Sequence, residues 1–195
     1  MNPMPVVLEG RVVRLEPLRI EHVPGLCAVG LDAELWRWTV AQVRTEDDLR
    51  RYVGQALELE RQGVALPFAT IERASGKPVG STRYGTIDRA NRRVEIGWTW
   101  LGRAYQRTAL NTEAKYLMLR HAFEDLGCIR VELKTDALNQ QSRNAMLRFG
   151  AQEEGILRHH QITEAGRPRD TVYYSVLKDE WPQVKAWFEA RMVAR

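Results

Sequence analysis

The sequence is poor in cysteine and contains no long apolar run. Its 195 residues include two cysteines, Cys27 and Cys128, too few for a disulfide framework or a four-cysteine zinc site. We expect both to be core residues, because unreactive cysteines usually pack in the interior. No hydrophobic stretch approaches the ~20 residues that span a bilayer, and residues 1–5 lack the basic and apolar segments of a signal peptide. These absences favour a cytoplasmic protein that does not enter a membrane.

The chain also lacks a strong charge of either sign. It carries 29 Lys and Arg against 25 Asp and Glu, a net charge of +4, and the basic residues are interspersed with acidic ones. No basic stripe is interleaved with aromatic residues, so we do not expect sequence-specific binding of nucleic acid. Two interpretations of the mild positive balance stay open, a solvated surface or an affinity for a polyanion such as a phosphorylated cofactor or RNA.

Residue periodicity predicts one mixed α/β domain over residues 1–195. Alternating apolar residues predict strands at 11–18, 66–72, 79–86, 93–101, 129–135, 151–162 and 170–177. Helical spacing predicts helices at 21–29, 46–62, 111–126, 140–150 and from about 179 onward. Thr45 and Asp48 form a capping-box pattern at the start of the second helix. The order is β-α-α-β-β-β-α-β-α-β-β-α.

Two strand–loop–helix junctions stand out as possible anion sites. The first covers residues 106–114, directly after the strand at 93–101, and the second begins at Asn139 after the strand at 129–135. The first N–H groups of a helix have no partner within it, so such a junction can hold a phosphate. The alternative for each is an ordinary helix start, capped by Asn111 or by Asn139. Two junctions in one small domain suggest a phosphate-bearing cofactor that lies across a sheet.

The strand at 93–101 has a regular alternation. Its pattern predicts one face with Val94, Ile96, Trp98 and Trp100, and an opposite face with Glu95, Gly97 and Thr99. Gly97 can mark a bulge or a close approach of the backbone.

With this order of elements, the chain resembles the GNAT superfamily of acyl-CoA-dependent N-acyltransferases, and within it the branch of ribosomal-protein alanine acetyltransferases. The resemblance runs from Leu8-Glu9-Gly10-Arg11 to the final helix. The segments that carry it are Val94-Glu95-Ile96-Gly97-Trp98, Thr112-Glu113-Ala114, Asn139-x-x-Ser142, Phe149-Gly150-Ala151 and Glu153-Glu154-Gly155. It implies a central, largely antiparallel twisted sheet of about seven strands with helices on both faces.

The resemblance implies acetyl-CoA as cosubstrate and no metal. The pyrophosphate loop would comprise Gln106, Arg107, Thr108, Ala109, Leu110, Asn111 and Thr112. Backbone groups of Trp98, Thr99 and Trp100 would pair with the pantetheine arm, and Asn139 would hydrogen-bond it. The loop departs from the family's Gln/Arg-x-x-Gly-x-Gly/Ala pattern, because Ala109 and Asn111 occupy the small-residue positions and Arg107 replaces a common glycine. Arg107 could add a charged contact to a phosphate.

The resemblance also assigns the chemistry. Glu95 is the candidate base that takes the amine proton, with an ion-pair or surface role as the alternative. Gln161 stands where the alanine acetyltransferases have a second glutamate, so Glu164 and Asp170 are substitutes. Ser142 would donate a hydrogen bond to the cofactor sulfur, with Tyr174 as second choice.

Two further aromatic residues and a histidine pair complete the candidates. Trp36 and Trp38 would line the acceptor slot, unless they are core residues. Adjacent strand residues point to opposite faces, so His159 and His160 cannot readily share a metal ion.

The sequence therefore predicts an N-acetyltransferase that transfers acetyl from acetyl-CoA directly to a primary amine. The expected acceptor is a protein N-terminal α-amine, as in ribosomal-protein alanine acetylation. Two alternatives stay open: acetylation of a small amine such as an amino acid, polyamine or aminoglycoside, and a non-catalytic acyl-CoA-binding or sensing domain. The protein is expected to be a monomer or a homodimer.

Overall fold

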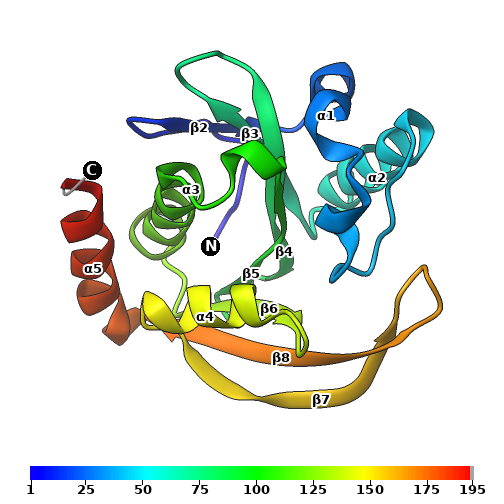
Figure 1. The fold of residues 1–195 in the computed structure, drawn as a ribbon. Helices are drawn as coiled ribbons and strands as arrows, with labels where there is room; N and C mark the ends of the chain where they lie inside the picture. Colours follow the sequence, from blue (N-terminus) through cyan, green and yellow to red (C-terminus); the bar gives the residue numbers. More distant parts are fainter. Residues whose placement is uncertain (194–195) are drawn as a thin grey trace.

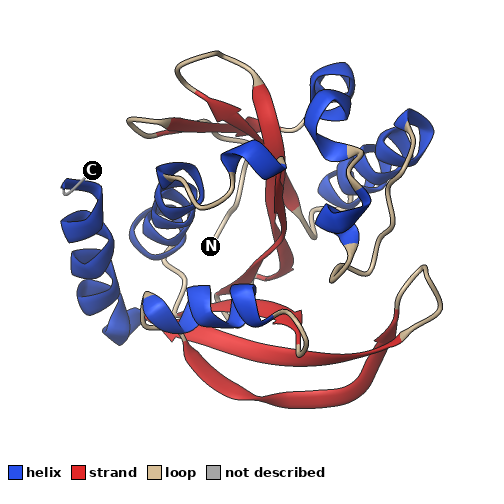
Figure 2. Cartoon of the chain, viewed as in Figure 1, coloured by secondary structure: helices blue, strands red, loops and turns tan. Residues whose placement is uncertain are grey.

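A computed structural model describes residues 1–193 (Figures 1 and 2). The strands are β1 (Leu8–Glu9), β2 (Val13–Pro17), β3 (Leu66–Glu72), β4 (Pro78–Asp88), β5 (Arg93–Leu101), β6 (Arg130–Asp136), β7 (Gln152–Ile162) and β8 (Pro168–Leu177). The α-helices are α1 (Val23–Gly30), α2 (Glu46–Arg61), α3 (Ala109–Arg120), α4 (Gln140–Arg148) and α5 (Trp181–Val193). Short turns of helix precede α1, α3 and α5, and residues 121–125 extend α3 as a π-helical turn. No helix in this described part is long and apolar enough to cross a membrane.

All eight strands form one sheet, in the order β1-β2-β3-β4-β5-β6-β8-β7. Every neighbouring pair is antiparallel except β5 and β6, which are parallel. Their pairing covers three residues of each strand, Arg93–Glu95 against Arg130–Glu132. Beyond this point the two strands separate, so the sheet is forked between the second half of β5 and the second half of β6 (Figure 1). The predicted mixed, largely antiparallel fold is confirmed, with the two-residue β1 as an additional edge strand.

Two hydrophobic clusters cover the two faces of the sheet. Helices α3 and α5 pack on one face, in a cluster that includes Val94, Ile96 and Leu117. Helices α1 and α2 pack on the other face, around Trp36, Tyr52 and Trp100. In Figure 1 the pairs α1/α2 and α3/α5 lie on opposite sides of the upper strands, and α4 covers the lower ones.

The start of α2 agrees with its sequence signal. Thr45 Oγ1 accepts a hydrogen bond from the Asp48 N–H, and Asp48 accepts one from the Thr45 N–H, which is the predicted capping box. Asn111 does not cap α3, although an ordinary helix start with an Asn111 cap was the alternative interpretation of this junction. The helix begins at Ala109, and Thr108 caps it by accepting from the Leu110 N–H.

The regular alternation predicted for β5 is wrong beyond Gly97. Arg83 of β4 faces Gly97 and Ser81 faces Trp100, so three steps along β5 match two along β4, which is a β-bulge. Trp98 at the bulge has a left-handed φ of 50°. The extra residue moves Trp100 to the α1/α2 face, away from Val94 and Ile96, while the Thr99 side chain turns toward α3. A one-residue slip exchanges the two faces of a strand, because its side-chain period is two.

Candidate functional site

The loop at residues 102–109 joins the end of β5 to the start of α3. Gln106 Nε2 donates to the Leu101 carbonyl over 3.1 Å, so this side chain ties the loop to β5. Thr108 Oγ1 donates to the Tyr105 carbonyl as well as capping the helix. Both side chains therefore stabilise the conformation of the predicted pyrophosphate loop. The first turn of α3 has N–H groups without a partner in the helix, which an anion could accept from.

Arg107 lies in this loop with an exposed side chain and a left-handed φ of 59°. Only glycine adopts such a backbone at no steric cost. The structure thus explains why a glycine is common at this position in the family that the sequence resembles. Its side chain makes no hydrogen bond or ion pair with any residue from 1 to 193, so the guanidinium is available to an anion.

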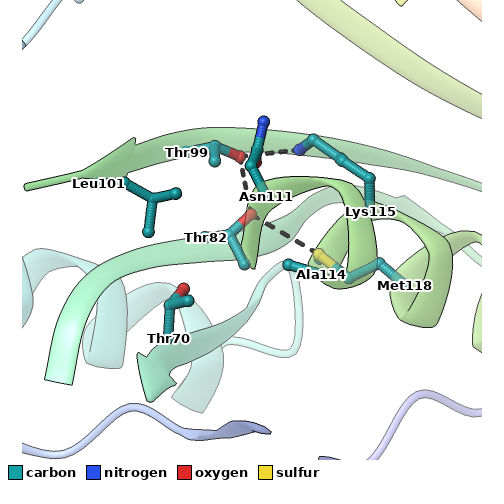
Figure 3. Close-up of a pocket in the computed structure, with 8 residues that line it drawn as sticks. All are labelled: Thr70, Thr82, Thr99, Leu101, Asn111, Ala114, Lys115 and Met118. Carbon is teal, nitrogen blue, oxygen red and sulfur yellow. Dashed lines mark hydrogen bonds between the residues drawn. The ribbon is translucent and has the colours of Figure 1, made fainter. Parts of the chain in front are cut away.

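A small pocket lies between the first turns of α3 and the middle of the sheet (Figure 3). Thr99 Oγ1 is 2.7 Å from Thr82 Oγ1 and accepts from Lys115 Nζ over 2.9 Å. Asn111 Oδ1 also lies in this pocket, buried and without a hydrogen-bond partner among the described residues. Asn111, predicted to belong to the pyrophosphate loop, therefore directs its carbonyl oxygen toward the sheet. Other lining residues are Thr70, Leu101, Ala114 and Met118.

Lys115 is the charged member of this pocket. Burial disfavours its ammonium form and lowers the pKa of Lys115 to about 7, against a smaller opposing effect of the Glu95 charge. No carboxylate among residues 1–193 lies within ion-pair distance of its Nζ. An amine with this pKa is partly neutral at neutral pH, which makes it a titratable group beside the predicted pantetheine segment.

The opposite face of β5 carries the candidate base. Glu95 is 5% exposed, and its Oε2 lies 2.8 Å from Lys134 Nζ on β6 and 3.0 Å from Thr86 Oγ1. Burial opposes the charge of Lys134, but the hydrogen bond and charge of Glu95 outweigh it and raise the pKa of Lys134. Lys134 Nζ also lies 4.7 Å from the centre of the Tyr173 ring. Glu95 is thus an ion-pair partner at the point where β5 and β6 separate.

Trp98 lies beside Glu95 on this face. It is 42% exposed, and its ring covers Gly85, where an added Cβ would lie 2.2 Å from a ring carbon. Tyr52 of α2 donates a hydrogen bond to the Trp98 carbonyl over 3.3 Å. The bulge therefore presents a large aromatic side chain at the fork.

The two tryptophans predicted at the acceptor slot have different environments. Trp36 is 1% exposed, packs against Tyr52 and Trp100, and donates from Nε1 to the Gly30 carbonyl. It is a core residue and does not line a surface slot, which is the alternative that the sequence left open. Trp38 is half-buried, and Arg37 and Arg167 stack on it.

The second junction is at the start of α4. Asn139 Oδ1 accepts from the Ser142 N–H over 3.1 Å, so Asn139 caps this helix. Ser142 is half-buried, and no residue in the described range hydrogen-bonds its Oγ. Tyr174 is fully buried and donates to Glu153 over 2.8 Å, in agreement with the packing role that was its alternative.

The remaining candidates have structural partners. Glu164 Oε2 accepts from the Gln42 N–H, and Asp170 Oδ1 accepts from the His159 N–H.

Glu113, in the Thr-Glu-Ala segment, has a structural role. Its carboxylate accepts hydrogen bonds from the N–H groups of Arg11, Val12 and Val13 and so stabilises the turn before β2. Cys128 is buried, as predicted, and Cys27 is half-buried. Residues 1–193 contain no group of three or more His, Cys, Asp or Glu arranged to hold a metal ion.

Sequence reasoning missed three residues at this site: Lys115, Lys134 and Thr86. A lysine on a helix or a strand normally indicates a solvated surface, and only the packing of α3 and β6 brings these two to the fork. The pattern of β6 gave no signal for Lys134, because this residue shares the polar face of the alternating strand with Arg130 and Glu132.

Comparison with known proteins agrees with this geometry. The acetyltransferase (GNAT) domain matches residues 13–152. A GCN5-related N-acetyltransferase from Brucella melitensis has 35% sequence identity and a TM-score of 0.89 over 97% of this chain and 86% of its own. YdaF of Bacillus subtilis (strain 168), a candidate ribosomal N-acetyltransferase, is 34% identical over 106 residues, which is 54% of this chain and 57% of YdaF.

Mycobacterium smegmatis RimJ, solved in complex with CoA-disulfide, resembles the chain more distantly. Its TM-score is 0.79 at 24% identity, over 95% of this chain and 91% of RimJ. At this identity the likeness concerns the fold alone.

Proposed function

Because this chain belongs to the acetyltransferase (GNAT) family and is an acyl-CoA-dependent acetyltransferase, we propose that it acetylates the N-terminal α-amine of a protein by direct transfer. The observation that carries the proposal is the fork between β5 and β6, with the N-terminus of α3 at one end and the Glu95–Lys134 pair at its base. The fork leaves backbone groups of β5 without a strand partner, and these can pair with an extended ligand.

The residues at the fork fit acetyl-CoA. The first turn of α3, with Arg107 beside it, would bind the pyrophosphate, and the backbone of residues 98–100 would pair with the pantetheine arm. Asn139 Oδ1 is used by its helix, so its amide N–H groups would be the ones that bind the arm. Acetyl-CoA supplies an activated acyl thioester, and no covalent enzyme intermediate is required. Ser142 Oγ, which has no protein partner in the described chain, would donate a hydrogen bond to the sulfur as it leaves.

Glu95 would accept the proton of the acceptor ammonium through a water molecule. Its carboxylate accepts hydrogen bonds from Lys134 and Thr86, which orient it. The proton would then pass to solvent, to which the neighbouring Trp98 is 42% exposed.

Two observations bear on the class of the amine acceptor, and each favours a different class. The description of YdaF as a ribosomal N-acetyltransferase favours a protein N-terminus. The rim of the site favours a small amine as the second candidate. In the turn between β7 and β8, the Glu164 N–H donates to the Val40 carbonyl over 2.9 Å, and Glu164 Oε2 accepts from the Gln42 N–H over 2.7 Å. This turn is therefore hydrogen-bonded to the connection between α1 and α2, and the link would limit one side of the acceptor approach.

The test measures release of free thiol from acetyl-CoA with two acceptor panels, peptides with free N-termini and small primary amines. Turnover with peptides and with no small amine supports the proposed acceptor. Turnover restricted to small amines replaces it with the second candidate. An absence of turnover with both panels, in a protein that CoA stabilises against heat, would contradict the proposed activity.

A further inference from the structure

Arg83 of β4 is a buried arginine without an acidic partner. Its side chain is 4% exposed, and its guanidinium carbon lies 5.1 Å from the centre of the Tyr52 ring and 5.0 Å from that of Trp98. No residue from 1 to 193 forms a hydrogen bond or an ion pair with this guanidinium. Arginine stays charged at any pH at which proteins fold, so a positive charge is held between two aromatic rings.

The two rings satisfy only the faces of the guanidinium. Cation–π contacts involve the flat faces, whereas the five N–H donors lie in the plane. A buried donor without an acceptor costs about 1–3 kcal/mol, and a charged one costs more. The unpaired nitrogens of Arg83 are not fully buried, so the small exposed part of this residue includes them. The N–H edge is thus presented at a narrow opening.

This edge belongs to the same face of the sheet as the candidate base. Arg83 pairs in register with Gly97, and Glu95 lies two residues before Gly97 on the same face. Trp98, which stacks on Arg83, is the exposed residue of the bulge. A molecule that brings its amine to Glu95 and contacts Trp98 therefore passes the guanidinium.

A second arginine on this face also has unused donors. Arg169 of β8 is 8% exposed, and its Nε is buried and has no hydrogen-bond partner in residues 1–193. Asp136, which lies 3.9 Å from that Nε, makes a closer ion pair with Arg167. The Glu95–Lys134 pair lies between the strands of Arg83 and Arg169. This face therefore holds two buried arginines, and Arg83 is the one with no acidic partner among the described residues.

We propose that the amine acceptor carries a carboxylate, which the in-plane N–H groups of Arg83 bind. The inference rests on the proposed function and narrows its acceptor. A carboxylate is planar and presents two oxygens at the spacing of the guanidinium fork, so it fits a narrow opening between two rings. Such a carboxylate has two sources, a small amino acid or an acidic side chain beside the N-terminus of a peptide.

The experiment compares acceptors that differ only by a carboxylate and a carboxamide. The small-molecule pair is β-alanine and β-alaninamide, and the peptide pair is Ala-Asp-Ala-amide and Ala-Asn-Ala-amide. We expect Arg83→Met to raise the KM of the carboxylate member about tenfold or more and to leave the carboxamide KM within about twofold, because a charged hydrogen-bonded contact is lost. The pair that responds identifies the source. Arg83→Lys keeps the charge without the fork and should restore part of the loss.

A direct binding measurement accompanies the kinetics. Isothermal titration of the responding carboxylate into the CoA complex should show binding to the wild type and at least tenfold weaker binding to Arg83→Met. Arg61→Gln is the matched control, because this arginine at the end of α2 has a side chain that is 74% exposed. Thermal unfolding checks that each variant is folded.

Failure of the inference differs from failure of the proposed function. If wild type acetylates both members of a pair and Arg83→Met slows both equally, Arg83 does not bind a carboxylate, although the enzyme is an amine acetyltransferase. If wild type turns over no amine of either panel, the proposed function fails first.

Discussion

The two faces of β5 each carry a cation without an acidic partner in the described chain, Lys115 half-buried on one face and Arg83 buried on the other. On the α3 face, Lys115 contacts the neutral hydroxyl of Thr99, and its pKa falls to about 7. On the α1/α2 face, Arg83 cannot lose its proton and is stacked between Tyr52 and Trp98. Burial can remove the charge of a lysine, but it can only leave an arginine in need of an anion.

This difference separates two tasks. A face whose charge can be lost suits a largely neutral ligand segment such as a pantetheine arm, since no permanent charge is desolvated when the arm binds. A face whose charge is permanent suits an anionic ligand. We therefore expect cofactor recognition and acceptor recognition on opposite sides of one strand, and the following changes test that division.

Replacement of the candidate base should have the largest effect. Glu95→Gln leaves Lys134 without its partner and removes the proton acceptor, so we expect kcat to fall about 10²–10⁴-fold. Affinity for CoA, measured by titration, should stay unchanged. Glu132→Gln is the control, because this glutamate is also buried and pairs with Arg93 and Arg130. An equal loss of kcat in both variants would indicate a purely structural role for Glu95.

The second-largest effect is expected from a methyl group at Gly85, on the face of the sheet that carries Arg83. The added Cβ of Gly85→Ala would overlap the Trp98 ring, so we expect a loss of about 1–3 kcal/mol in the free energy of unfolding and a higher acceptor KM. Urea denaturation measures the first and steady-state kinetics the second. Gly54→Ala in α2, where nothing lies within 4 Å of the new Cβ, should instead stabilise the protein slightly. A Gly85→Ala variant with unchanged stability would show that the Trp98 ring is not held in place.

The ionisation of Lys115 should make the stability of the protein depend on pH. The folded lysine loses its proton near pH 7, whereas the unfolded one keeps it to about pH 10.4. Between these values the unfolded state binds more protons, so stability rises with pH, by about 1.4 kcal/mol per unit at most, and is independent of this group below pH 7.

Lys115→Met should remove this slope. Urea denaturation of both proteins at pH 7 and pH 9 measures the difference, which we expect to reach about 2 kcal/mol. Lys77→Met, at an exposed turn, is the control and should behave as wild type. A wild-type slope equal to that of Lys115→Met would mean that Lys115 stays protonated when folded.

The smallest effect is expected in the cofactor loop. Arg107→Gly relieves a left-handed backbone and should stabilise the fold by about 1 kcal/mol, while the KM for acetyl-CoA rises a few-fold through loss of a phosphate contact. Arg107→Lys keeps both the charge and the strain and serves as the reference. An unchanged KM in Arg107→Gly would place this guanidinium away from the phosphates.

Much of the fold could be predicted, because its signals are local. The strand at 66–72, the strand at 93–101 and the Thr45 capping box appear where the sequence predicts them. The faces of β5 could not be predicted past Gly97, because a bulge depends on the register with β4 and leaves no reliable mark in the strand itself. The same limit hid Lys115 and Lys134, whose environments are formed by α3 and β6.

The sequence by itself determined the order of elements, the helix caps and the family, since periodicity, capping residues and motif spacing are properties of neighbouring residues. The tertiary structure alone decided which side chains meet at the fork. It made Trp36 a core residue, gave Glu95 a lysine partner and placed Arg83 between two rings without an anion. The physical reason is that burial and charge pairing arise between strands and helices distant in the chain. The one extra residue at Trp98, for example, exchanges the faces on which the following side chains of β5 lie.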